Sequence, residues 1–121
     1  MSPARPGCRP RGLEAARILL DLPTPPTAVL ASNDVSALAV LEVARERNLQ
    51  VPGDLSVVGF DDIPEAAHVH PPLTTMRQPL EEMGRVAASA LLGIMHAPNR
   101  VPERLELPTE LVIRGSTAAR K

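Results

Sequence analysis

Hydrophobic residues gather in short, nearly continuous runs separated by a helix-length stretch. Residues 27–32 and 55–60 are two mostly apolar runs of strand length, as expected for strands of a parallel sheet that are buried on both faces. The roughly twenty residues between them exceed the dozen that a parallel crossover needs. The pattern therefore predicts an α/β fold built on a parallel sheet.

Helical spacing of apolar residues marks three helices. The middle one starts at Asn33 or Asp34 and carries one apolar stripe, formed by Ala37, Val40, Leu41 and Ala44, that can pack on the sheet. The other two span about residues 13–22 and 80–95, and further strands are expected at 73–77, 105–107 and 109–114. The last predicted helix is strongly amphipathic.

A short polar motif follows each of the first two strands. Asn33-Asp34 ends the first apolar run, and Asp61-Asp62 follows Gly59-Phe60 at the end of the second. Ligands of open α/β sheets bind at the carboxyl ends of the strands, so we expect Asn33 and Asp61 to open into a common cleft. The structural alternative is that Asn33 caps the helix and that Asp61 accepts nearby backbone N–H groups.

Composition excludes several classes of protein. The formal net charge of -1 does not indicate the basic surface that binding of nucleic acid requires. The single cysteine, Cys8, excludes an internal disulfide. No apolar run reaches membrane-spanning length and no signal peptide is recognisable, so a cytoplasmic location without membrane contact is expected. Phe60 is the only aromatic residue, which predicts an aliphatic core.

His68 and His70 are candidates for a metal site. Residues two apart on a strand point to the same side, and Asp61 could add an oxygen ligand, which would give a small metal-dependent hydrolase. Two prolines follow directly and favour a loop with exposed histidines. We therefore expect no metal, no cofactor and no enzyme activity.

The motifs also occur in an order and spacing that resemble a known family. The matching segments are Gly12–Ala16, Pro26–Asp34, Val51–Asp62, Pro72–Pro79, Leu80–Gly84 and Leu107–Val112. Together they resemble the carboxyl-terminal part of bacterial transcription regulators of the lactose-repressor (LacI/GalR) family. The resemblance covers about residues 12–117.

The resemblance implies a sensor domain like the type I periplasmic binding proteins, incomplete on its amino-terminal side. Residues 1–11 would be a disordered leader, 12–75 the distal effector-binding subdomain, 76–108 a remnant of the proximal subdomain, and 109–121 a crossover strand and tail. Met76 and Pro108 would mark approximate hinges. The family's helix-turn-helix has no counterpart in this sequence, which looks like a fragment, so DNA would be contacted only through a part outside it.

Residue roles follow from the same resemblance. Asn33 matches the position whose amide hydrogen-bonds the effector, a sugar or nucleoside-like molecule, and Asp61 matches the carboxylate that accepts effector hydroxyl or N–H groups. Asp62 is expected to brace the loop or to pair with an arginine. The distal subdomains would form a homodimer through residues that correspond to Val35, Leu38, Ala66 and His70, although Val35 and Leu38 could instead pack within the chain.

The resemblance leaves a second function of the same fold open, the sugar-binding component of an uptake system. That function would require an export signal. Half of a cleft cannot enclose a ligand, so we expect the isolated chain to bind effector weakly or not at all. The apolar stripe of residues 80–94 further predicts aggregation or partner-dependent folding.

Overall fold

The computed structural model describes residues 7–97, 99 and 104–120. They divide into two compact units, each described separately below: unit 1 comprises residues 1–77 and 111–121, and unit 2 comprises residues 78–110. The elements are α1 (Cys8–Leu20), β1 (Ala28–Leu30), α2 (Asp34–Glu46), β2 (Ser56–Val58), the 3-10 helix η1 (Pro64–Ala67), β3 (Thr75–Arg77), α3 (Leu80–His96) and β4 (Glu110–Val112).

The predicted strand–helix–strand unit is present. β1 and β2 pair in parallel with Val29 opposite Val57, and α2 is the crossover between them. Isolated parallel bridges then join Val58 to Thr74 and Asp61 to Arg77, so the chain that follows β2 runs along β3. β4 pairs with β3.

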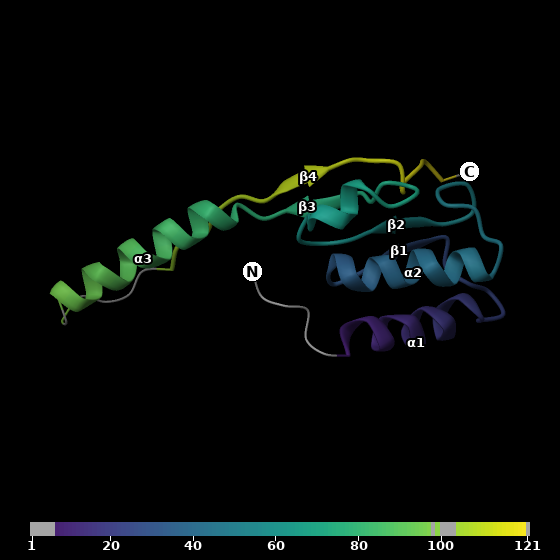
Figure 1. Ribbon diagram of the computed structural model, residues 1–121, viewed down its shortest axis with the longest axis horizontal. Coiled ribbons are helices and arrows are strands. Elements are labelled where there is room, and N and C mark those ends of the chain that lie inside the picture. Colours follow the sequence, from purple (N-terminus) through teal and green to yellow (C-terminus); the bar gives the residue numbers. More distant parts are fainter. Residues whose placement is uncertain (1–6, 98, 100–103, 121) are drawn as a thin grey trace. The chain divides into compact units, whose positions relative to one another are not determined.

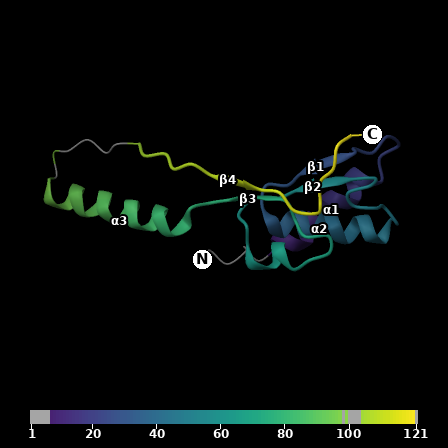
Figure 2. The same ribbon diagram turned by 90° about the horizontal axis from the view of Figure 1, so that it is seen from above.

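The two helices of unit 1 lie side by side on one side of β1 and β2 (Figures 1 and 2). The apolar stripe predicted for α2 is buried, and it packs in one aliphatic cluster with residues of α1, β2 and the following loops. The cluster contains Ala16, Leu20, Ala31, Ala37, Val40, Leu41, Val43, Ala44, Leu55, Val57, Ala66 and Leu73. Asn48 ends the helix segment with a φ of 56°, as its left-handed propensity predicts.

Small residues set the distance between α1 and α2. A Cβ atom on Gly12 would lie 3.0 Å from the Cβ of Ala39 and 3.3 Å from the Cα of Ser36. Ion pairs between the exposed edges of the helices join Arg9 to Glu42 at 2.6 Å and Arg17 to Glu46 at 3.3 Å. Such exposed pairs contribute little, so the close apolar contact holds the two helices together.

Three sequence-based expectations are wrong in detail. α1 already begins at Cys8, so residues 8–11 are helical and not disordered; residues 1–6 lie outside the described part. β1 is not buried, since Leu30 is 77% exposed, because among the described residues it has a strand partner on one side only. Residues 105–107 form no strand, because the described part of unit 2 offers them no strand to pair with.

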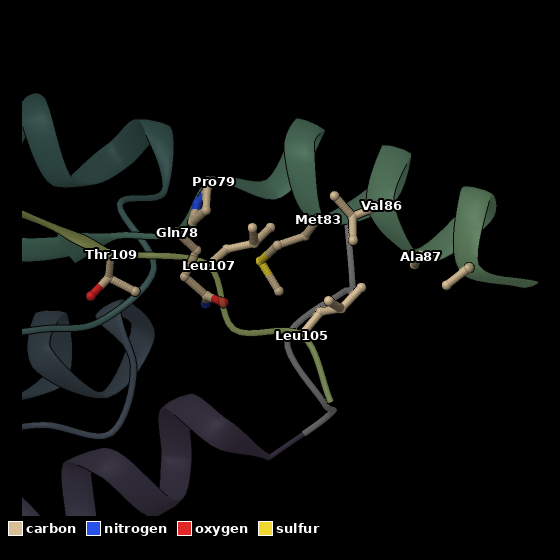
Figure 3. A pocket seen from close by; sticks show the side chains of 9 residues that line it. Gln78, Pro79, Met83, Val86, Ala87, Leu105, Leu107 and Thr109 are labelled. Atoms are coloured by element: carbon tan, nitrogen blue, oxygen red, sulfur yellow. The ribbon is translucent and has the colours of Figure 1, made fainter. Parts of the chain in front are cut away.

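In the described part of unit 2, the helix α3 has the extended segment 104–109 beside it. None of the described α3 side chains is buried, and Leu80, Leu91 and Met95 are among the exposed apolar residues. Met83, Leu105 and Leu107 point toward one another in a groove of about 350 Å³ (Figure 3). Among the described residues, no helix is both long and apolar enough to cross a membrane.

Candidate functional site

The carboxyl ends of β1 and β2 meet at one edge of unit 1. The backbone N–H of Ala31 donates to the carbonyl oxygen of Val58 at 2.8 Å, and that of Asp34 donates to the carbonyl oxygen of Phe60 at 3.0 Å. Asn33 directly precedes Asp34, and Asp61 directly follows Phe60, so both residues are next to this second hydrogen bond. The two residues singled out from the sequence therefore lie at the same edge, on adjacent segments.

Asn33 caps α2. Its backbone is extended, with a φ of -155°, and its side-chain oxygen accepts a hydrogen bond of 2.8 Å from the backbone N–H of Ser36. The capping interpretation is confirmed, but it engages only the oxygen of the side-chain amide. The amide nitrogen is the group that can donate to a ligand, so capping and ligand binding use different atoms.

Asp61 and Asp62 stand on a strained turn. Both have a left-handed backbone, with φ values of 133° and 62°, and residues other than glycine hold such conformations at a cost of about 1–3 kcal/mol each. The backbone N–H of Asp61 donates to the carbonyl oxygen of Met76 at 2.9 Å. Strain of this kind persists only where the surroundings enforce it, and it is concentrated at functional sites.

Asp62 forms ion pairs with two arginines. One carboxylate oxygen accepts from Nε of Arg77 at 2.7 Å and the other from a guanidinium nitrogen of Arg114 at 2.8 Å. Burial alone would raise the pKa of the Asp62 carboxyl, but the hydrogen bonds and charges of the two arginines outweigh it and hold that pKa below its usual 3.8. Asp62 is thereby charged and fixed, and it anchors the turn from the side of β3.

Arg114 is the better sheltered partner of Asp62. Its side chain is 16% exposed and that of Asp62 is 11% exposed, whereas Arg77 is 50% exposed. Arg114 also donates to the carbonyl oxygen of Leu73 at 3.0 Å. The pairing of Asp62 with an arginine that the sequence suggested is thus present, but which arginines pair with it depends on contacts between residues far apart in the sequence.

Asp34 is a further residue of this edge that sequence reasoning treated only as a helix start. It is fully buried, and its carboxylate accepts hydrogen bonds from the loop after Asp62 and from β3. A carboxylate at the first position of a helix is ordinarily explained by the helix dipole. Gly59 was the one feature of the sequence that could have indicated the buried carboxylate of Asp34, because any side chain at position 59 would occupy the same space.

A shallow hollow of about 360 Å³ lies beside Asn33. Its walls come from α1, β1 and the start of α2, and include Ala15, Val29 and Ser36. Asp61 is not among its lining residues. The expected common edge is therefore present, but this hollow is not a cleft shared by Asn33 and Asp61, because Asp61 lies on the β2 and β3 side.

The metal alternative has no matching geometry. His68 and His70 are both exposed, and among the described residues no three His, Cys, Asp or Glu side chains come close enough together to hold a metal ion. The two histidines sit in the loop after η1, where the prolines that follow exclude a regular strand. Asp61, His68 and His70 therefore do not come together as such a group in this structure.

The four residues expected at a dimer interface differ in exposure. Val35 and Leu38 are half-buried and His70 is exposed. Ala66 is 0% exposed and belongs to the aliphatic core, so its side chain is not available for the contact with a partner chain that was expected of it. The turn of η1 directs its methyl group inward, and its carbonyl oxygen accepts from the backbone N–H of Leu73 at 2.8 Å.

Comparison with known proteins identifies the fold. The sequence profile of the periplasmic binding protein-like domain matches residues 3–117. The chain belongs to this family. The chain is similar in structure to the transcriptional regulator CelR, solved as a cellobiose complex: the TM-score is 0.83 at 41% identity, over 89% of the present chain and 33% of CelR.

Curated relatives of this periplasmic binding protein-like domain are transcription repressors. The repressor CytR of Escherichia coli (strain K12) is 46% identical over 108 residues, which are 89% of the present chain and 32% of CytR. The ribose operon repressor of the same strain is 41% identical over 105 residues, 87% of the present chain and 32% of the repressor. The resemblance to the lactose-repressor family is confirmed. The chain spans about a third of the length of these relatives.

Proposed function

We propose that the chain is the effector-sensing part of a LacI-like transcription repressor and that Asn33 and Asp61 bind the effector. The observation that carries the proposal is the hydrogen bond between Asp34 and Phe60, which joins the two segments that bear these side chains. An amide that donates and a carboxylate that accepts, on adjacent segments of one sheet edge, suit a molecule with several hydroxyl groups. The effector we propose is a sugar or a nucleoside.

The relatives support this choice of ligand. CelR was solved with cellobiose, and another relative is named for the ribose operon. A hydrogen bond to the charged Asp61 carboxylate contributes roughly 1.5–3 kcal/mol, and one from the neutral Asn33 amide contributes roughly 0.5–1.5 kcal/mol. The two groups alone would thus give a dissociation constant of about 1 mM or weaker, in line with the weak binding expected for the isolated chain.

The proposal extends to the partners of the whole protein. Units 1 and 2 would correspond to parts of the distal and proximal subdomains, with their boundaries close to Met76 and Pro108. Val35, Leu38 and His70 would contribute to a homodimer of distal subdomains. DNA would be contacted in the cytoplasm by a helix-turn-helix outside these residues, whose orientation the effector would bias.

A titration of the isotope-labelled chain with ribose and with cellobiose, followed through backbone amide shifts, tests the function. We expect saturable shifts in the segments 31–36 and 59–63, with a dissociation constant of about 1 mM or weaker, and a loss of these shifts in Asp61→Ala. Sorbitol serves as a control for the effect of polyol concentration. Sugar-dependent shifts confined to other segments, or micromolar affinity that survives Asp61→Ala, would contradict the proposal.

The two other functions considered from the sequence are less well supported. The curated relatives described above are repressors and not uptake proteins. The hydrolase alternative lacks a cluster of metal-binding side chains among the described residues. A binding role therefore fits this site better than a catalytic one.

A further inference from the structure

Asp34 touches both ends of the turn that carries Asp61. Its backbone N–H donates to the carbonyl oxygen of Phe60 at 3.0 Å, where the turn begins. One oxygen of its carboxylate accepts from the backbone N–H of Ile63 at 2.9 Å, where the turn ends. The other oxygen accepts from the hydroxyl of Thr75 on β3 at 2.6 Å.

We propose that Asp34 is a positioning residue of the effector site, which holds the Asp61 turn in its strained conformation and at a fixed distance from Asn33. The inference rests on the proposed function, since it assigns Asp61 to the ligand. Asp34 itself is 0% exposed and would not touch the effector. It would act through the turn that it holds.

The packing around the carboxylate explains why it can hold the turn so closely. A Cβ atom on Gly59 would come 2.1 Å from one carboxylate oxygen of Asp34 and 3.0 Å from Cδ2 of Leu73. The carboxylate thus occupies the space that a side chain at position 59 would need. The carboxylate of Asp34 is thus in contact with Gly59, with the backbone N–H of Ile63 and with the hydroxyl of Thr75.

The chain order ties both ligand-binding residues to the same anchor. Asn33 precedes Asp34 directly and caps α2, while Asp61 lies between the two points at which Asp34 holds the turn, Phe60 and Ile63. Any displacement of Asp34 would therefore change the separation of the amide and the carboxylate offered to the effector. A fixed separation is what recognition of one particular ligand requires.

Hydrogen bonds, and not charge, would carry this role. An asparagine at position 34 could accept from the N–H of Ile63 with its oxygen and donate to the hydroxyl of Thr75 with its nitrogen, because a threonine hydroxyl can donate or accept. Asp34→Asn should then preserve the turn. Asp34→Ala should release it, because both side-chain bonds are lost.

The experiment uses the full chain and two readouts of the turn that need no ligand. These are the three-bond coupling between the amide and α protons of Asp61, which reports φ, and the hydrogen exchange of the Ile63 amide. In Asp34→Ala we expect the coupling to change to that of an averaged backbone and the exchange to rise about tenfold or more. Asp34→Asn should retain both values.

Asp54→Ala is the matched control. The carboxylate of Asp54 also accepts a backbone N–H, that of Gln50 at 2.8 Å, but in the turn that precedes β2. Its removal should leave the coupling of Asp61 unchanged. The proposal is overturned if Asp34→Ala keeps the coupling and the Ile63 exchange of the unchanged chain, or if Asp34→Asn loses them to the same extent as Asp34→Ala.

Thr75→Val decides the question if Asp34→Ala does not fold. It removes one of the two side-chain bonds and keeps the shape of the residue, so the Ile63 exchange should rise roughly fivefold; an unchanged rate would overturn the proposal. Ribose titrations of the same variants separate the two hypotheses. Sugar shifts of the unchanged chain that are confined to other segments count against the proposed function, whereas the ligand-free readouts still decide whether Asp34 positions the turn.

Discussion

Gly59→Ala is the substitution whose effect the structure defines most sharply. The added Cβ atom would lie 2.1 Å from a carboxylate oxygen of Asp34, whereas an ordinary carbon–oxygen contact is about 3.3 Å or longer. The carboxylate must therefore retreat by roughly 1 Å. Its hydrogen bonds to Thr75 at 2.6 Å and to Ile63 at 2.9 Å cannot both survive such a shift.

The expected loss of stability can be worked out from these bonds. Each is accepted by a carboxylate oxygen and contributes roughly 1.5–3 kcal/mol, which gives about 3–6 kcal/mol for the pair. Alanine restricts the unfolded chain and returns about 0.4–1 kcal/mol. The free energy of unfolding should thus fall by about 2–5 kcal/mol, a large share of the roughly 5–15 kcal/mol available to a small domain.

Urea unfolding followed through the backbone amide of Val57, a buried residue of β2, measures this change. Gly53→Ala is the control in the same unit, because a Cβ there would meet only the Cβ of Gln50, at 3.2 Å. That variant should stay within about 1 kcal/mol of the unchanged chain. Gly59→Ala with a free energy of unfolding equally close to the unchanged chain would refute the account of the Asp34 contacts.

Three further predictions concern Asp62 and α3. The pKa of Asp62 is lowered in the folded state, so its contribution to stability is present above its unfolded pKa of about 3.8 and is lost as the pH falls through the lower folded value. In urea unfolding measured from about pH 6 down to about pH 3, the free energy of unfolding of Asp62→Asn should therefore fall less steeply than that of the unchanged chain. An identical pH dependence of the two proteins would contradict the assignment. Gly84→Ala, at an open position of α3, should stabilise the helix by about 0.5–1 kcal/mol, seen as greater helicity by circular dichroism; no gain would mean that α3 is not helical there in solution. Leu91→Lys should reduce concentration-dependent self-association in sizing experiments, since Leu91 is 59% exposed, and an unchanged elution profile would show that this stripe does not drive association.

The parallel strand–helix–strand unit could be predicted because its information is local. The apolar stripe through Ala37 and Val40 has the period of a helix, and the continuous apolar runs around Val29 and Val57 have the length of strands. The common edge of Asn33 and Asp61 then follows from the rule for parallel sheets. Local patterns therefore identified the segments that form the candidate site.

The contacts that shape the site could not be predicted, because they join residues distant in the sequence. Thr75 is 41 residues from Asp34, and Arg114 is 52 residues from Asp62. Nothing in the pattern around Ala66 indicates that η1 turns its methyl group into the core. The strand expected at residues 105–107 is absent for a related reason, since pairing depends on a partner that local sequence does not report.

The most direct measurement for the central claim is the detection of intermolecular nuclear Overhauser effects between a bound sugar and the side chains of the isotope-labelled chain. With ribose or cellobiose at saturating concentration, we predict cross-peaks from one sugar to both the side-chain amide protons of Asn33 and the β protons of Asp61. Cross-peaks to only one of these residues, or to a different part of unit 1, would contradict the claim that the two side chains bind the same effector.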